Sequence, residues 1–371
     1  MNILVDNAGF INKGAELMLR SCEQEIKNKF KNAKLVINPH TVGGKTSKPI
    51  GEDFLIYQDH VAFSILPEKI NRKFFFVKPN EIDYLLDAGG FQFGDQWATM
   101  FNTTSNRKAS NYYKNLRKSG AKLIFLPQAF GPFKNVMAAE RMKFVAEQAH
   151  LLFARDKISY QYLVDLLGKD DKIVLKPDFT NLMKPQVPLT QFINDKAHVC
   201  VIPNSKMMSA TDEKVSNAYI DFMTTVCELF INANKSLILL NHEGDGDKEI
   251  IDKIQQNLTK KALVLSGLNA IEVKAVIAKM EILVSSRFHG VVSGLSQGVC
   301  TFATGWSHKY PELLGDFGVA KNLLDVLQPE IAHEKIITAL KNNNSKHHTS
   351  PTAILAMEKK SKSMWEQVWS I

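Results

Sequence analysis

Cysteine is scarce in this sequence, and long apolar runs are missing. Its 371 residues include four cysteines, at positions 22, 200, 227 and 300, and no two of them form a CxxC pair. This spacing indicates neither a zinc site nor a disulfide framework. No stretch approaches the roughly 18 consecutive apolar residues of a membrane-spanning helix. The opening segment Met1–Asp6 lacks the basic start of a secretory signal peptide. We therefore expect a cytoplasmic location.

Several motifs of common enzymes are missing as well. The sequence contains no HExxH and no complete GxGxxG, which removes the commonest zinc-hydrolase and dinucleotide-binding interpretations. The D-x-D of Asp245-Gly246-Asp247 resembles a metal motif, but it opens a predicted helix. N-capping explains these acidic residues without a metal. We therefore expect neither a metal nor a bound cofactor.

Basic residues outnumber acidic residues by 46 to 38, so the net charge is +8. This excess favours an anionic partner such as a phosphate or a carboxylate. Two basic clusters, around residues 27–34 and 107–118, are best explained as solvated helix faces. Neither has the interleaved aromatic residues of a single-strand binder. We expect no nucleic-acid partner.

Short apolar runs alternate with longer amphipathic runs, which is typical of βαβ units with parallel sheets. The alternation pauses at Met183–Gln191, where Pro185 and Pro188 indicate a linker, and then resumes. The length also exceeds the roughly 250–300 residues that one core serves. We therefore predict an α/β fold of two Rossmann-like domains, 1–185 and 192–345, with the active site in the cleft between them. A final helix follows over 351–371.

The segment Ile282–Leu295 carries the strongest functional signal. An apolar strand leads directly into Arg287 and His289 and then into a helix of small residues. Backbone N–H groups at a helix start favour anions, and Arg287 adds a fork of donors. The unperturbed pKa of a histidine side chain suits proton transfer near neutrality, which makes His289 a candidate acid or base. Lys309 follows the next strand, and adjacent parallel strands would bring it to the same place as a second cation. His242 also follows a strand, and it either lines the cleft or is a solvated loop histidine.

In the first half of the chain, loops after predicted strands supply further candidates for residues that line the cleft or the acceptor site. Asn12 lies in the first β–α turn, and Arg155 ends a strand from which it could reach the cleft. Asp156 is placed to cap the helix that begins near Lys157. The remaining candidates lie in two turn-rich loops: Gly89, Gly90 and Asp95 in the first, and Gln128 in the second.

Taken together, these segments resemble the polysaccharide pyruvyl transferase family over residues 1 to about 320. The matching pieces are Asn12–Glu16, Asp87–Asp95, Gln128–Phe133, Ala154–Asp156 with Ser159, Pro177-Asp178, Ser286–Gly290 with Lys309, and Gly315–Gly318. The resemblance implies a glycosyltransferase-B-like fold, with the acceptor on the N-terminal domain and the donor on the C-terminal domain. It also implies that phosphoenolpyruvate is a co-substrate, and that a pyruvate ketal forms on a sugar of a surface-polysaccharide precursor, which in this family is often lipid-linked. In this scheme His289 is the general acid and then base, and Arg155, Arg287 and Lys309 bind the donor.

Two other functions use the same residues. A sugar-nucleotide-dependent glycosyltransferase could hold a diphosphate with this set of cations, and a non-catalytic glycan-binding or anion-binding protein could bind without turnover. The final helix also has two interpretations. Its apolar face predicts packing against the N-terminal domain, whereas Lys359, Lys360 and Lys362 would suit a peripheral contact at the inner face of a membrane.

Overall fold

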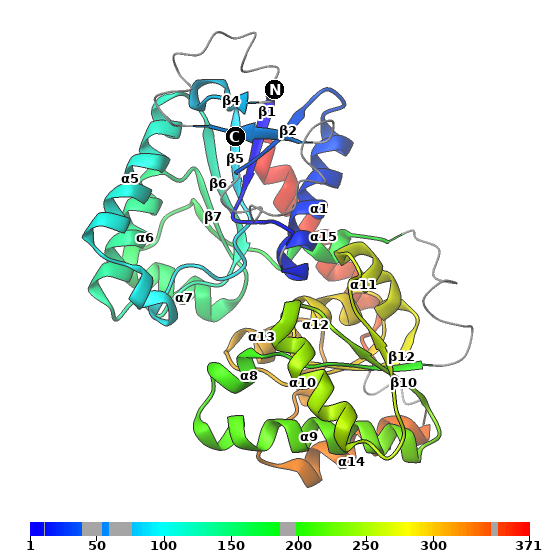
Figure 1. Ribbon diagram of the computed structural model, residues 1–371. Coiled ribbons are helices and arrows are strands. Elements are labelled where there is room, and N and C mark those ends of the chain that lie inside the picture. Colours follow the sequence, from blue (N-terminus) through cyan, green and yellow to red (C-terminus); the bar gives the residue numbers. More distant parts are fainter. Residues whose placement is uncertain (11, 39–53, 59–75, 186–197, 343–347) are drawn as a thin grey trace. The chain divides into compact units, whose positions relative to one another are not determined.

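The computed structural model describes residues 1–10, 12–38, 54–58, 76–185, 198–342 and 348–371 (Figure 1). The chain divides into two compact units. The first unit consists of Met1–Ile11, Met18–Phe179 and Lys360–Ile371, and the second consists of Asn12–Leu17 and Thr180–Lys359. Helix α1 (Lys13–Lys29) and helix α15 (Pro351–Val368) therefore each contribute residues to both units.

An eight-stranded parallel sheet forms the centre of the first unit, in the order β4-β3-β2-β1-β5-β6-β7-β8. Chain order runs outward from β1 to β4 on one side and from β5 to β8 on the other, so the order reverses between β1 and β5. The strands are β1 (Asn2–Asp6), β2 (Lys34–Ile37), β3 (Leu55–Tyr57), β4 (Phe76–Val77), β5 (Tyr84–Asp87), β6 (Lys122–Gln128), β7 (Leu151–Ala154) and β8 (Ile173–Leu175).

Helices cover both faces of this sheet, as Figure 1 shows. One face packs on α5 (Thr103–Lys118), α6 (Val136–Gln148) and α7 (Lys157–Leu167), around a core that includes Leu123, Phe125 and Met142. Asp156 caps α7, because its carboxylate accepts the Ser159 N–H. This confirms the predicted cap. Short 3-10 segments complete the unit: η1 (Pro79–Glu81), η2 (Asp95–Met100) and η3 (Phe179–Leu182).

The C-terminal half of α15 belongs to the first unit, and aromatic contacts hold it there. The Trp365 ring lies edge-on to Phe179, with ring centroids 5.7 Å apart. Trp369 makes the same kind of contact with Phe30 and Tyr84, at 5.2 and 5.8 Å. Edge-to-face pairs of this kind stabilise packing beyond the area that they bury.

Among the described residues, no helix combines the length and the apolar character needed to cross a membrane.

The second unit contains a five-stranded parallel sheet in the order β11-β10-β9-β12-β13. The strands are β9 (His198–Ile202), β10 (Ser236–Leu240), β11 (Leu263–Leu265), β12 (Met280–Ser285) and β13 (Cys300–Ala303). The helices are α8 (Lys206–Ser209), α9 (Glu213–Asn232), α10 (Gly244–Asn257), α11 (Ala270–Ala278), α12 (Phe288–Leu295), α13 (Lys309–Asp316) and α14 (Pro329–Asn342), with the 3-10 segment η4 (Ala320–Asn322).

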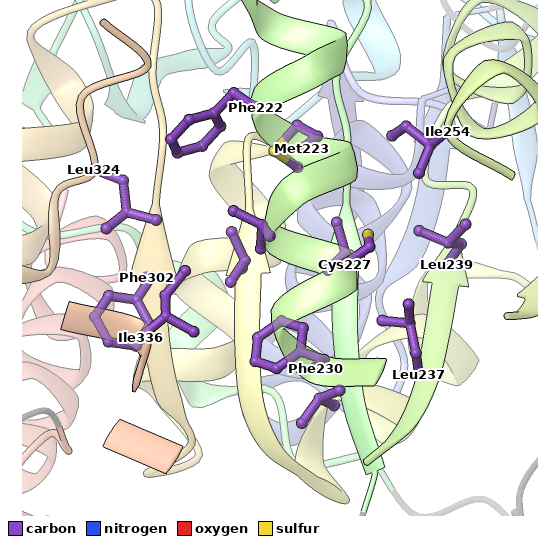
Figure 2. Packing of buried hydrophobic residues seen from close by; sticks show 14 of the residues in the cluster. Phe222, Met223, Cys227, Phe230, Leu237, Leu239, Ile254, Phe302, Leu324 and Ile336 are labelled. Carbon is purple, nitrogen blue, oxygen red and sulfur yellow. The ribbon is translucent and has the colours of Figure 1, made fainter. Parts of the chain in front are cut away.

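Helix α9 forms the centre of the larger core of this unit. Figure 2 shows Met223, Cys227 and Phe230 of α9 among side chains from β10, β13, α10 and α14. Helix α12 packs closely on the sheet because of its small residues. A Cβ on Gly294 would lie 2.3 Å from the Thr301 hydroxyl, so a larger residue there would push α12 away from β13.

The alternating pattern is confirmed in both units, with some differences at its edges. The sequence interpretation missed β3, α8, α13 and α14, and it began α10 four residues late, at Lys248 instead of Gly244. Of the predicted linker, Met183–Pro185 are described, and 186–191 lie outside the described residues.

Candidate functional site

The strand order of the second sheet reverses between β9 and β12. Open α/β sheets bind ligands outside the carboxyl ends of the strands at such a reversal. Asn204 follows β9 and Ser286-Arg287 follow β12, so these residues lie at that point. The Asn204 side chain ties the two together, because its Nδ2 donates to the Ser286 carbonyl at 2.8 Å.

Hydroxyl groups support the segment that carries Arg287. The Ser286 hydroxyl lies 2.6 Å from that of Tyr219 and 2.5 Å from that of Thr304. Tyr310 donates its own hydroxyl to the Ser286 carbonyl at 2.7 Å. All four residues are buried, and a buried polar network with its bonds made fixes the backbone that it surrounds. The functional segment is therefore held rigidly.

Arg287 is buried and engages two carboxylates. Its Nε and Nη2 donate to Asp247 at 2.8 and 2.5 Å, and its Nη1 contacts Glu243. Burial lowers the pKa of Arg287 to about 10, so the guanidinium stays charged at neutral pH. Burial raises the pKa of the Asp247 carboxyl to about 7, and the hydrogen bonds from Ser205 oppose that shift.

Asp247 therefore corrects the sequence interpretation, which treated this acidic residue as a helix cap. The residue at the N-cap position of α10 is Glu243, and it makes no side-chain cap bond. Asp247 lies within the first turn, where its carboxylate also accepts the Ser205 N–H at 2.9 Å. Sequence reasoning missed Asp247 and Glu243 as partners of Arg287. The signal that was available is two acidic side chains just after the end of β10.

His289 lies at the start of α12, against the first turn of α1. A Cβ on Gly14 would come within 2.3 Å of the His289 Nδ1, so only glycine leaves room for the imidazole there. Asn12 begins this turn, and its side-chain oxygen accepts the N–H groups of Gly14 and Ala15 at 2.7 and 3.2 Å. The structure thus places the predicted Asn12 as the cap that shapes the surroundings of His289.

Lys309 is buried beside the same segment and is surrounded by aromatic rings. Its Nζ lies 4.6 Å from the ring centre of Trp306, 5.3 Å from that of Phe288 and 5.7 Å from that of Tyr310. Cation–π attraction of this kind holds an ammonium group in a partly desolvated place. Lys309 thus lies close to the segment of Arg287 and His289, as the adjacency of the two parallel strands predicts.

His242 is buried, and not a solvated loop histidine. Its pKa is held well below the usual range, first by burial and then by the positive charges of Arg287, His289 and Lys13. The imidazole is therefore neutral at physiological pH. Because the charges of Arg287 and His289 act on it, His242 lies near these two candidate residues of the second unit.

A second cluster, in the first unit, centres on Asp87 at the end of β5. Its carboxylate accepts hydrogen bonds from Asn7 Nδ2, Gln92 Nε2 and Gln128 Nε2, at 2.7, 2.5 and 3.1 Å, and from the Gly89 N–H at 3.2 Å. Burial, followed by the charge of Asp6, raises the pKa of Asp87 to about 7. The predicted Gly89 and Gln128 thus help to organise the turn that follows β5.

Arg155 and Gly90 meet in this cluster, because the Arg155 Nη2 donates to the Gly90 carbonyl at 3.0 Å. The Arg155 Nη1 forms a buried ion pair with Asp178 at 3.1 Å. Asp95 lies apart from them and accepts the N–H groups of Lys134 and Asn135, at 2.9 Å each. These contacts order the loops, and a role of Arg155 in binding a donor stays a prediction. Within the described ranges, no group of three or more acidic, histidine or cysteine residues could hold a metal ion.

Comparisons with known proteins agree with this architecture. The sequence model described as polysaccharide pyruvyl transferase matches residues 12–308. No curated protein matches the chain. Among solved structures, UDP-GlcNAc 2-epimerase from Neisseria meningitidis is similar at a TM-score of 0.59 and 11% identity, and Anabaena HepE in complex with UDP-glucose at 0.60 and 13%. Each comparison covers 100% of both chains. At such low identity the likeness shows the fold alone, and the predicted glycosyltransferase-B-like class is confirmed.

Proposed function

Because the chain belongs to the polysaccharide pyruvyl transferase family, we propose that it moves the enolpyruvyl group of phosphoenolpyruvate onto a sugar of a surface-polysaccharide precursor. The product is a pyruvate ketal that bridges two hydroxyls of that sugar. The observation that carries the proposal is the group formed by His289, Arg287 and Lys309, which follow the neighbouring strands β12 and β13. It combines an imidazole with two buried cations beside the start of a helix.

The chemistry of ketal formation explains each member of this group. His289 donates a proton to the methylene carbon of phosphoenolpyruvate, and positive character develops at C2. One sugar hydroxyl attacks C2 and loses its proton, and the C2–O bond to phosphate breaks. The second hydroxyl then closes the ring and its proton goes to the departing phosphate, so two hydroxyls and phosphoenolpyruvate give a ketal and inorganic phosphate. His289, deprotonated in the first step, can accept a hydroxyl proton.

The cations stabilise the carboxylate of the donor and the departing phosphate. Arg287 already engages two carboxylates, so the donor must displace one of them. Glu243 is the one to leave, since its side chain is 30% exposed whereas that of Asp247 is fully buried. Asp247 then keeps the guanidinium in place while Nη1 turns to the donor. Lys309 supplies a second positive charge from a fixed position.

The experiment that tests this function measures phosphate release from phosphoenolpyruvate across a panel of free and lipid-linked saccharides. We expect release with at least one acceptor and a fall of roughly 10²–10⁴-fold in His289→Gln. His348→Gln, a change outside the site, is the control. A loss of less than about tenfold in His289→Gln would remove the acid–base role from this residue.

A nucleotide-sugar arm tests the competing function. The similar structures named above hold UDP-GlcNAc or UDP-glucose, so UDP-sugars are titrated in parallel with phosphoenolpyruvate. Turnover of a UDP-sugar without turnover of phosphoenolpyruvate would replace the proposed reaction with a glycosyl transfer. Binding of either compound without any turnover would support an anion-binding protein.

A further inference from the structure

The first unit contains a cavity of about 800 Å³ that the reaction described above does not use. It lies where the order of the first sheet reverses, because Asp6 and Asn7 at the end of β1 line it together with Phe91 and Gln92 from the loop after β5. Such reversals are preferred ligand sites. The volume falls within the roughly 300–1,000 Å³ typical of pockets for small ligands.

Seven of the eighteen residues that line this cavity are aromatic. They come from the end of β3, from the loop after β5, from η2 and the residue that follows it, and from α5. They are Tyr57, Phe91, Phe93, Trp97, Phe101, Tyr112 and Tyr113. The indole of Trp97 is fixed, since its Nε1 donates to the Phe91 carbonyl at 2.8 Å. Trp97, Phe91 and Tyr112 are only half-buried, so their rings still have surface that a ligand can cover.

A buried carboxylate lies among these rings. Asp6 is 3% exposed, and it accepts the Tyr112 hydroxyl at 2.7 Å and the Asn7 N–H at 2.8 Å. Burial and the Asp6 charge raise the pKa of Tyr112, so its hydroxyl remains a donor. Asn7 adopts a left-handed backbone conformation, with φ of 56°, and donates its Nδ2 to Asp87. The carboxylate of Asp6 and the side chain of Asn7 are therefore held in place by hydrogen bonds before any ligand binds.

The cations at the cavity are less suited to a phosphate. Arg141 stacks over the Phe101 ring at 5.0 Å, and its Nε and Nη2 donate to Asn106 and Ser105 at 2.8 and 3.2 Å. Lys108 is on an exposed part of α5. Asp6 would also repel an anion. The aromatic rings and the Asp6 carboxylate instead match a pyranose. Its C–H face can stack on a ring, and its hydroxyl groups can donate to a carboxylate.

We propose that this aromatic cavity at the β1–β5 reversal binds a neutral sugar ring of the acceptor saccharide. That the cavity binds a sugar is inferred from the cavity alone. That this sugar belongs to the acceptor of the reaction rests on the proposed function. The ring stacks on Trp97 or Tyr112, and its hydroxyls donate to Asp6. This role is one of binding and orientation, without a part in proton transfer to the donor.

Saturation-transfer NMR on the full chain tests the cavity directly. The probes are the methyl pyranosides of glucose, galactose and mannose, together with N-acetylglucosamine and UDP. We expect at least one sugar to bind, with the strongest transfer to its ring C–H protons. Trp97→Ala and Asp6→Asn should each weaken that binding by at least about tenfold. Thermal unfolding establishes that each variant is folded.

Matched controls separate the cavity from the rest of the unit. Asp83→Asn removes an exposed carboxylate at the amino end of β5, on the opposite edge of the same sheet. Tyr160→Ala removes a half-buried ring from α7. Neither control should change sugar binding. Binding that persists in both Trp97→Ala and Asp6→Asn, or Trp97-dependent binding of UDP with no sugar bound, would overturn the proposal.

The kinetics then distinguish the two proposals. If both hold, Trp97→Ala raises the KM for the acceptor and leaves the KM for phosphoenolpyruvate unchanged. Sugar binding in the cavity without any phosphate release from phosphoenolpyruvate would refute the proposed donor and leave the sugar site standing. Phosphate release with an unchanged acceptor KM in both variants would refute the sugar site and leave the reaction standing.

Discussion

Asp247 and Arg287 form a two-point ion pair, with Nε and Nη2 of the guanidinium 2.8 and 2.5 Å from the two carboxylate oxygens. Forty residues separate them in the chain, and both side chains are buried. The pair links the first turn of α10 to the residue that precedes α12. It therefore fixes the position of the cation that we propose to bind the donor.

Replacing Asp247 by Asn should destabilise the protein and lower activity together. Removing one partner of a buried pair leaves an uncompensated charge and costs about 3–5 kcal/mol. Chemical denaturation measures the loss. Asp252→Asn on the same helix is the control, because Asp252 pairs with Lys248 at the surface. An equally small effect of both changes would show that the contact with Glu243 is enough to hold Arg287.

Replacing Glu243 by Gln should strengthen the binding of phosphoenolpyruvate several-fold, because the donor no longer competes with a carboxylate for Arg287. Isothermal titration calorimetry measures the affinity. Glu249→Gln makes the same charge change at an exposed position of α10 and serves as the control. Weaker binding in Glu243→Gln would mean that Glu243 positions Arg287 and is not displaced.

Gly14→Ala should lower turnover with little effect on stability. The new methyl group would lie 2.3 Å from the His289 Nδ1, so the imidazole has to move. A displacement of about 1 Å can cost on the order of 10²-fold in rate. Gly315→Ala in α13 is the control, because a Cβ there meets nothing within 4 Å. Equal turnover in the two variants would argue against a catalytic position for His289.

The buried His242 should make the protein less stable as the pH falls below about 6.5. Its folded-state pKa is depressed, so below its ordinary pKa the unfolded chain takes up a proton that the folded protein does not. This contributes up to about 1.4 kcal/mol per pH unit. His242→Asn should therefore give a shallower dependence of unfolding free energy on pH between 6.5 and 5.

The other histidines with depressed pKa values, His150 and His333, add the same slope to the wild type and to the His242 variant. His348→Asn controls for the substitution itself. A slope that is identical in the wild type and in His242→Asn would show that His242 is protonated in the folded state.

Trp365→Ala should lower the free energy of unfolding by about 3–5 kcal/mol, the usual cost of emptying a buried tryptophan site. Leu355→Ala on the same helix should change little, since Leu355 is 64% exposed. Denaturant titrations give both values. Unchanged stability together with lost association with anionic vesicles would favour the membrane interpretation of this helix.

Much of the fold can be predicted from the sequence because its signals are local. Apolar runs of four to seven residues mark most strands, and Asp156 caps α7 through a bond three residues along the chain. The approach of Lys309 to the Arg287 segment follows from one rule, that adjacent parallel strands end at the same edge.

The charge state of the site could not be predicted in the same way. Whether Arg287 is open to an anion depends on Asp247 and Glu243, which come from another helix and loop. The burial of His242 likewise depends on tertiary packing, and its spacing from β10 is the same whether it is solvated or enclosed. The aromatic cavity is assembled from four separate segments, none of which has a distinctive motif.

The distribution of α15 between the two units has a consequence for how the protein is made. Residues 360–371 belong to the first unit, and they cover Phe30, Tyr84 and Phe179 with the rings of Trp365 and Trp369. A ribosome synthesises these residues only after the whole of the second unit. The contacts of Trp365 and Trp369 with Phe30, Tyr84 and Phe179 can therefore form only after the second unit has been synthesised. The part of the chain that begins folding first is completed last.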